Sequence, residues 1–259
     1  MIPKVIHYCW FGRNPLPTDA KKCIESWRKY MPDYEIKEWN ENNFDVNSIP
    51  YTQEAYKAKK YAFVSDYARF WILYNYGGVY FDTDVQVIKS MDDIISKGPF
   101  MGCEIDAKSD LEVPKVNPGL GLAVNPGLGL FKEMLELYST LHFINLDGSY
   151  NQKTIVAYTT EMLLKYGLKP ISGIQECAGV FIYPTEYFCP LSFETKKLNI
   201  TNNTRSIHLF SASWISKSSL LKIKLYRIIK KCIGEKKTKF LLNVVKKIKG
   251  NMRKYKKLK

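Results

Sequence analysis

The sequence predicts an α/β fold in one domain, residues 1–216, followed by a basic amphipathic helical tail, residues 217–259. Two observations lead to this fold class. Segments with the apolar periodicity of strands alternate with segments that have the periodicity of helices. The 259 residues, 46% of them hydrophobic, are enough for one substantial core, and no linker-like segment divides them.

The first forty residues are expected to form a strand, a helix and a strand, the unit from which doubly wound sheets are built. The strands cover residues 3–9 and 34–39, and the helix covers residues 18–30, with Thr18 or Asp19 as its N-cap. Further helices are predicted at residues 63–76, 130–142 and 151–166, and further strands at 79–81, 85–88, 99–104, 180–183 and 206–210. The glycine-rich residues 117–122, partly repeated at 125–130, do not fit the phosphate-binding glycine pattern and are interpreted as a loop, a strand and a turn.

The net charge of +14 is concentrated in the tail. Residues 217–259 contain 17 Lys or Arg and one Glu, whereas residues 1–216 contain 22 basic and 24 acidic residues. Because apolar residues recur among the lysines at helical spacing, we expect the tail to bind an anionic membrane surface. Binding to nucleic acid is disfavoured, since an apolar face has no use on a phosphate backbone. Packing of the apolar face on the body or on a partner helix stays open.

The cysteines and the beginning of the chain indicate a cytoplasmic protein. The six cysteines include no Cys-x-x-Cys pair, so we expect reduced thiols rather than disulfides or a zinc site. The first residues lack the cationic and apolar regions of a signal peptide. Together with the tail, this predicts attachment to the cytoplasmic face of a membrane.

Two carboxylates are predicted to emerge together after a buried strand. Strand residues 79–81 follow a glycine pair, and Asp82 and Asp84 then point to the same side because strand side chains alternate. The helix just before carries Asp66 and Arg69 on one face at i,i+3 spacing. Carboxylates at the carboxyl ends of strands in an α/β sheet suit Mg²⁺ or Mn²⁺ bound to a diphosphate.

The Asp-x-Asp pattern alone is weak, since chance gives roughly 0.5 occurrences in a chain of this composition. Two solvated surface carboxylates are the ordinary alternative. That alternative leaves the charged pair on a neighbouring apolar helix unexplained, because burying charge is costly.

Several segments, in order, resemble the family 32 glycosyltransferases of bacterial capsule and lipopolysaccharide synthesis. The segments are IPKVIHYCWFG, SWRKYMPDYEIKEWNENNF, SDYAR, GGVYFDTDV and SIHLFSASW, and they span most of residues 1–216. The resemblance implies a Rossmann-like GT-A fold, a nucleotide-diphosphate sugar as donor, a divalent cation and retention of anomeric configuration.

The resemblance also implies roles for particular residues. Asp84 would coordinate the metal directly, Asp82 would bridge metal, ribose and sugar, and His208 would be a late metal ligand that favours Mn²⁺ over Mg²⁺. Asp66 and Arg69 would hold sugar hydroxyls and reach toward the phosphates. The remaining donor contacts would come from Tyr8, Trp10, Ser65, Tyr80, Ser213, Trp214 and Lys217, with Trp10 stacking on uracil, Tyr80 flanking the sugar, and Ser213 and Trp214 closing over the β-phosphate.

Three of these roles have ordinary structural alternatives. Trp10 can equally be a core tryptophan and His208 a core histidine. Asp66 and Arg69 can be a structural ion pair.

The function implied is transfer of a hexose, of galactose or glucose type and possibly N-acetylated, from a UDP-sugar to a lipid-linked oligosaccharide. We expect a front-face reaction in which the departing phosphate helps to deprotonate the acceptor hydroxyl. A covalent route through Glu104 or Asp106 stays open. Two rivals are a glycoside hydrolase, disfavoured because carboxylates two residues apart rarely flank a glycosidic bond, and a membrane or nucleic-acid adaptor without catalysis.

Overall fold

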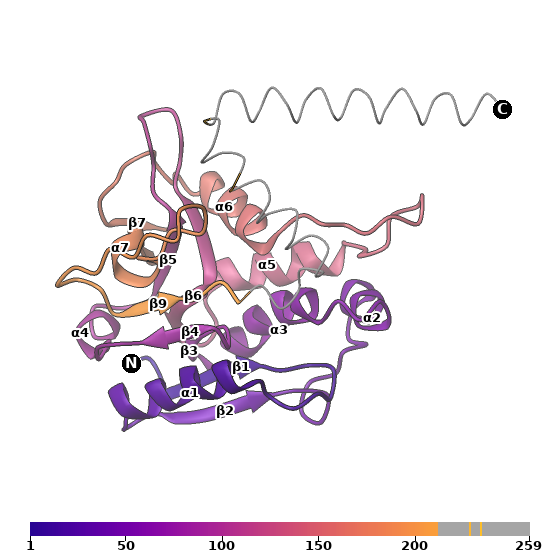
Figure 1. Cartoon of the computed structure of the whole chain (residues 1–259). Coiled ribbons are helices and arrows are strands. Elements are labelled where there is room, and N and C mark those ends of the chain that lie inside the picture. The colour runs from indigo at the N-terminus through magenta and orange to yellow at the C-terminus, as the bar shows by residue number, and fades with distance from the viewer. Residues whose placement is uncertain (212–227, 229–233, 235–259) are drawn as a thin grey trace. The chain divides into compact units, whose positions relative to one another are not determined.

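The computed structural model describes residues 1–211 together with Ile228 and Gly234 (Figure 1). Residues 1–192 and 196–211 form one compact unit. A second unit, residues 193–195 and 212–259, lies almost entirely outside the described residues. Apart from Ile228 and Gly234, the predicted tail lies outside the part of the chain that is described, and so do its boundary at residue 216 and the residues Ser213, Trp214 and Lys217.

A seven-stranded mixed sheet forms the centre of the first unit, which confirms the α/β expectation (Figure 1). β1 pairs in parallel with both β2 and β3, as the predicted strand–helix–strand unit requires. β6 then runs antiparallel to β3 and β5. In spatial order the strands are β2 (Glu35–Trp39), β1 (Val5–Cys9), β3 (Gly78–Tyr80), β6 (Lys115–Val124), β5 (Phe100–Ile105), β8 (Val180–Tyr183) and β7 (Gln175–Cys177). β4 (Val85–Val87) and β9 (Ser206–His208) form a separate antiparallel pair.

Two apolar clusters cover the two faces of the central sheet. Val79 belongs to one cluster and Tyr80 to the other, and successive strand residues point to opposite faces. The helices are α1 (Thr18–Tyr30), α2 (Pro50–Lys57), α3 (Tyr61–Tyr76), α4 (Asp92–Ile95), α5 (Gly129–Ser139), α6 (Ile155–Lys165) and α7 (Thr185–Phe188). α1 contributes to the Val79 cluster, whereas α3, α5 and α6 contribute to the Tyr80 cluster.

Several predicted boundaries were wrong. The N-cap of α1 is Pro17, not Thr18 or Asp19, and no side chain caps the helix. α6 begins at Ile155 rather than at residue 151, because the Thr154 hydroxyl accepts a hydrogen bond from the Ala157 backbone and sets the helix start there. The helices α2, α4 and α7 and the strand β7 were not predicted.

The glycine-rich segment forms part of the longest described strand, β6, and interrupts it with a bulge. Met101 and Gly102 of β5 are adjacent, but their partners on β6 are Leu122 and Asn117. Residues 118–121 are therefore extruded from the β5–β6 ladder. Gly121 has a φ of +152°, which disfavours any other residue at that point. The interpretation as a loop, a strand and a turn missed that the strand is continuous around the bulge.

The described cysteines, Cys9, Cys23, Cys103, Cys177 and Cys189, are buried and free. Cys232 lies outside the described residues. None of the helices that the structure describes combines the length and apolar character needed to cross a membrane.

Candidate active site

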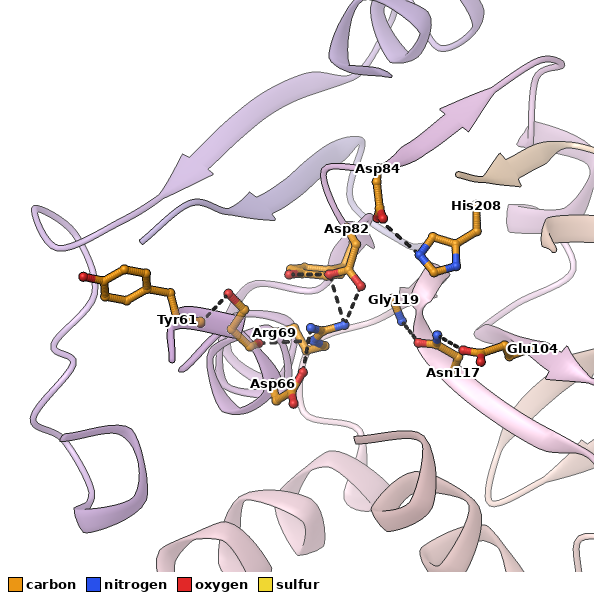
Figure 2. Close-up of polar contacts among 11 residues, drawn as sticks. Tyr61, Asp66, Arg69, Asp82, Asp84, Glu104, Asn117, Gly119 and His208 are labelled. Atoms are coloured by element: carbon orange, nitrogen blue, oxygen red, sulfur yellow. Dashed lines mark hydrogen bonds and ion pairs between the residues drawn. The ribbon is translucent and has the colours of Figure 1, made fainter. Parts of the chain in front are cut away.

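Asp82 and Asp84 lie in the turn between β3 and β4, beside α3 (Figure 2). α3 ends at Gly77, and both Gly77 and Gly78 adopt positive φ angles that allow the chain to turn directly into β3. β3 ends at Tyr80, one residue earlier than expected. The two carboxylates consequently extend from a turn, where each finds its own set of partners.

Arg69 is the buried cation beneath Asp82. Its Nη2 donates to Asp66 Oδ1 at 2.9 Å, and its Nη1 lies 3.2 Å from Asp82 Oδ1. Its Nε donates to the Ser65 carbonyl at 3.1 Å, and the guanidinium lies 4.8 Å from the centre of the Tyr80 ring. The i,i+3 ion pair that the spacing predicts is thus present, and it extends to the first aspartate of the turn.

One guanidinium here faces two carboxylates, the buried Asp66 and the partly exposed Asp82, so the charges are not fully balanced. Burial raises the pKa of Asp66 to about 7, although Arg69 opposes the shift and Asp82 adds to it. Burial also raises the pKa of Asp82, with Arg69 again opposing and Asp84 adding. The pKa of Arg69 rises despite burial because of the carboxylates around it. Within this cluster Asp66 therefore changes its protonation state near neutral pH, while Arg69 keeps its charge.

Asp82 is confined on its other side by the β6 bulge. Its backbone N–H donates to the Gly119 carbonyl at 3.0 Å, and the Tyr80 hydroxyl donates to its Oδ1 at 3.3 Å. A Cβ atom on Gly119 would stand 1.9 Å from Asp82 Oδ2 and 2.9 Å from Arg69 Nη1. Only glycine at this position leaves room for the aspartate in its observed orientation.

Asp84 is held by β9 and the residues that follow it. Its Oδ1 lies 3.2 Å from His208 Nε2, across the Val85–His208 register of β4 and β9. Its Oδ2 accepts hydrogen bonds from the Ser211 backbone and hydroxyl, each at 2.9 Å. Burial alone would raise the pKa of Asp84, but His208 and Ser211 lower it to about 2. Asp84 is therefore ionised at any physiological pH.

His208 has an unused ring nitrogen. Burial lowers its pKa, but the neighbouring carboxylates, Asp84 first, raise it above the ordinary value. The Nδ1 atom is buried and has no hydrogen-bond partner among the described residues.

The residue types at this site fit a divalent cation. Asp84 Oδ1 and His208 Nε2 are separated by 3.2 Å, close to the roughly 3 Å between adjacent ligands of an octahedral ion with bonds of about 2.1 Å. Carboxylate oxygen and imidazole nitrogen together suit Mn²⁺. No group of three or more His, Cys, Asp or Glu side chains within the described residues has the arrangement of a finished metal site. Two protein ligands plus substrate phosphate and water are the usual arrangement for such ions in phosphate chemistry.

The remaining predicted donor-binding residues lie on other elements. The Tyr8 hydroxyl donates to Glu38 at 2.6 Å, and the Trp10 indole N–H donates to the Asn14 carbonyl at 2.7 Å. The Ser65 hydroxyl donates to the Tyr61 carbonyl within α3. Within residues 1–211 no hydrogen bond or ion pair joins the Tyr8, Trp10 or Ser65 side chain to the two aspartates. Their assigned roles stay predictions.

The structure adds two residues that the sequence did not assign to the site, Gly119 and Asn117, and it connects them to Glu104, which the sequence left open as a nucleophile. Gly119 touches Asp82, and its backbone N–H donates to Asn117 Oδ1 at 2.8 Å. Asn117 Nδ2 in turn donates to Glu104 Oε2 at 2.6 Å. For Asn117 and Gly119 the only signal in the sequence was the Asn-Pro-Gly-Leu-Gly segment that contains them. The order of residues in this segment does not indicate which strand it lies beside.

Comparisons with known proteins agree with the chemistry of this turn. Residues 17–101 match the family described as a glycosyltransferase sugar-binding region containing a DXD motif. Inositol phosphoceramide mannosyltransferase 1 of Schizosaccharomyces pombe is 32% identical over 111 residues, which cover 39% of this chain and 33% of that protein. The uncharacterized glycosyltransferase L373 of Acanthamoeba polyphaga mimivirus is 34% identical over 106 residues, 39% of this chain and 42% of that protein. The chain thus matches less than half the length of each of these relatives.

Among solved structures, mouse xyloside xylosyltransferase 1 superposes with a TM-score of 0.47 and 9% identity, over 82% of this chain and 99% of that one. A glycosyltransferase involved in glycosylation of the major capsid of PBCV-1 gives a TM-score of 0.46 and 12% identity, over 86% and 100% of the two chains. These structural likenesses are distant.

Proposed function

We propose that this chain is a glycosyltransferase, because its residues 17–101 match the family of glycosyltransferase sugar-binding regions that contain a DXD motif. The DXD motif of this chain is Asp82-Thr83-Asp84. The observation that carries the proposal is the geometry at this motif, where Asp84 contacts His208 at 3.2 Å and Asp82 contacts Arg69 at 3.2 Å. Because Asp82 and Asp84 contact different side chains, we assign a different role in the site to each of them.

The proposed donor is a UDP-sugar bound with Mn²⁺, or alternatively Mg²⁺. Asp84 and His208 would hold the cation, with Asp82 turned toward the ribose and the sugar. The cation would stabilise the negative charge that grows on the leaving diphosphate. Trp10 would stack on the uracil base, and Tyr8 and Ser65 would line the donor site. Ser213, Trp214 and Lys217, which lie outside the described residues, would cover the phosphates.

Arg69 and Asp66 would act mainly by fixing Asp82. The guanidinium is almost fully buried and contacts both carboxylates, so it holds Asp82 in one orientation without rearrangement during the reaction. The same burial strengthens every electrostatic interaction in the cluster. Tyr80, whose hydroxyl reaches Asp82, completes this support rather than facing open space.

We propose retention of configuration through a front-face reaction. Asp82 and Asp84 are both engaged with cationic or hydrogen-bonding partners, which makes either a poor nucleophile. Asp106 is also occupied, since it accepts hydrogen bonds from the backbone and the hydroxyl of Thr185 at the start of α7. Of the two candidates for a covalent route, Glu104 and Asp106, this leaves Glu104.

The sugar and the acceptor are proposed from the family resemblance. We propose a hexose of galactose or glucose type, transferred to a lipid-linked oligosaccharide in capsule or O-antigen synthesis. The S. pombe relatives are mannosyltransferases by name, so a mannose donor belongs in any substrate panel. The basic tail would hold the enzyme at the cytoplasmic face of the membrane, where a lipid-linked acceptor is found.

The test incubates the full chain with Mn²⁺ and a panel of UDP-hexoses and GDP-mannose, and measures release of the nucleoside diphosphate. Asp84→Ala should lower the rate by at least about 100-fold, as expected for loss of a group that positions transition-state charge stabilisation. Asp147→Ala is the matched control, because Asp147 is an exposed loop residue whose side chain accepts hydrogen bonds, within the described residues, from Ser149 alone. Folded wild-type protein that binds and turns over none of the donors would refute the proposal.

A further inference from the structure

A second carboxylate lies beside the DXD turn, on the side of Gly119 opposite to Arg69 (Figure 2). Glu104 Oε2 accepts a hydrogen bond from Asn117 Nδ2 at 2.6 Å. Asn117 is itself fixed, since its Oδ1 accepts from the Gly119 backbone at 2.8 Å. Gly119 is the residue that packs against Asp82. An unbroken set of contacts therefore connects the first DXD carboxylate to Glu104.

The backbone aims Glu104 at this position through a β-bulge. On β5, Cys103 pairs with Val116 and Ile105 pairs with Lys115, so two steps on β5 match one step on β6. Glu104 is the extra residue. Bulges redirect a side chain relative to the regular alternation of a strand, and they recur beside active sites. The side chain is half-buried, as expected at the margin of a site rather than on an open surface.

Only one of the two Glu104 oxygens has a partner within the described residues. Oε2 is held by Asn117, whereas Oε1 has no hydrogen bond or ion pair to any described residue. Asp106, two residues later, is different because both of its oxygens bind Thr185. Of these two carboxylates, Glu104 alone retains, among the described residues, an acceptor atom for a ligand.

The charges nearby restrict what this atom can bind. Glu104 is close enough to His208 to be among the carboxylates that raise the pKa of that histidine. The phosphates of a donor bound at Asp84 and His208 would be repelled by another anion. A neutral group with a proton to donate is attracted instead, and hydroxyls are the donors that sugars carry.

We propose that Glu104 is a sugar-binding residue whose free Oε1 accepts a hydrogen bond from a hydroxyl of a sugar substrate, and that Asn117 is the positioning residue that orients it. The inference rests on the proposed function, since it assigns Glu104 to the same site. The hydroxyl belongs either to the transferred sugar or to the acceptor sugar.

The test compares wild type with Glu104→Gln, which keeps the size of the side chain and an oxygen for Asn117 but presents an amide N–H₂ in place of Oε1. Affinity is measured by calorimetry in the presence of Mn²⁺ for UDP, and for the UDP-hexose that wild type binds best. If the hydroxyl is on the transferred sugar, the variant should lose about 10-fold to 100-fold in affinity for the UDP-hexose and none for UDP. If the hydroxyl is on the acceptor, both affinities should be unchanged, and the KM for a methyl glycoside acceptor should rise by a similar factor.

Two controls make the result interpretable. Glu136→Gln changes an exposed glutamate on α5 and should leave all these values unchanged. Asn117→Ala should show the same selective loss as Glu104→Gln, and a variant that loses UDP and UDP-hexose equally indicates damage to the donor site instead. An unchanged UDP-hexose affinity together with an unchanged acceptor KM in Glu104→Gln would overturn the inference. Wild-type protein that binds none of the nucleotides would instead contradict the proposed function.

Discussion

At the scale of single residues, the orientation of Asp82 depends on the absence of a side chain at Gly119. Gly119 carries no Cβ, and one placed there would stand 1.9 Å from Asp82 Oδ2. Gly119→Ala must therefore push the carboxylate away from Arg69. We expect glycosyl transfer to fall by about 100-fold, since displacement of about 1 Å in a catalytic group has that effect. Thermal unfolding should show only a modest loss of stability, about 1–3 kcal/mol.

Gly173→Ala is the matched control for this prediction, because a Cβ at Gly173 would meet no atom within 4 Å. A Gly119→Ala variant with wild-type turnover would mean that Asp82 does not need its observed orientation.

His7 predicts a pH dependence of folding that is separate from the site. Its Nδ1 accepts from the Trp39 indole at 3.0 Å and its Nε2 lies 3.0 Å from the Gly77 carbonyl, so the ring is held neutral. Burial lowers the pKa of His7 to about 4. Between pH 6.5 and 4, His7 is protonated in the unfolded state but neutral in the folded state. The contribution of His7 to the free energy of unfolding therefore falls as the pH falls. The full loss is about 3 kcal/mol.

Denaturant unfolding of wild type and His7→Gln across pH 4–7 checks this expectation. The variant lacks the titrating group, so the difference in stability between the two proteins should shrink as the pH falls through this window. A difference that stays constant with pH would contradict the assignment. The variant is compared with wild type because both proteins contain Asp66, whose pKa is raised to about 7. Protonation of Asp66 stabilises the folded state as the pH falls, which is opposite to the effect of His7, and the comparison removes this contribution.

At the scale of elements, sequence periodicity predicted the parts of the fold that local patterns determine. α3 was predicted because its apolar residues recur without interruption up to the glycine pair, and β1, α1 and β2 because turn residues separate their different periods. The β6 bulge could not be predicted, since it depends on which residues of β5 lie opposite. The pairing of Asp84 with His208 likewise depends on the ladder between β4 and β9, two strands that lie far apart in the sequence. The spacing of Asp66 and Arg69 predicted their ion pair, but the contacts of Arg69 with Asp82 and of Asp84 with His208 could not be predicted.

α2, which was not predicted, depends on a contact made across the chain. Glu54 of α2 accepts hydrogen bonds from the backbones of Phe143 and Ile144, at 2.8 and 2.9 Å, and lies 2.7 Å from His142 Nδ1. These bonds lower the pKa of Glu54 despite its partial burial. Glu54→Ala removes all three interactions and should reduce the free energy of unfolding by about 1–3 kcal/mol.

Chemical denaturation measures this loss, with Glu136→Ala as the control on an exposed helical face. If Glu54→Ala is as stable as the control, these contacts do not anchor α2.

At the scale of the whole molecule, charge is distributed very unevenly along the chain. Residues 1–216 are nearly neutral with 22 basic and 24 acidic residues, whereas residues 217–259 carry 17 basic residues and one acidic residue. Under the proposed function, a body with balanced charge would let the donor site use the local fields of Arg69, His208 and the two DXD carboxylates without a strong background potential. The long-range attraction to anions would come from the tail. The proposal thus assigns catalysis and membrane location to different parts of one chain.

This division predicts that the membrane affinity of the protein depends on the tail and on salt. The full chain should sediment with vesicles containing anionic phosphatidylserine, because each cation near such a surface contributes about 1 kcal/mol. Deletion of residues 217–259 should abolish sedimentation while leaving nucleoside diphosphate release from a soluble donor within a few-fold of wild type. Raising the ionic strength toward 1 M should weaken binding, since the Debye length then shrinks to about 3 Å. Sedimentation that survives the deletion, or that is equal with neutral vesicles, would assign membrane binding to another part of the chain or to apolar contacts alone.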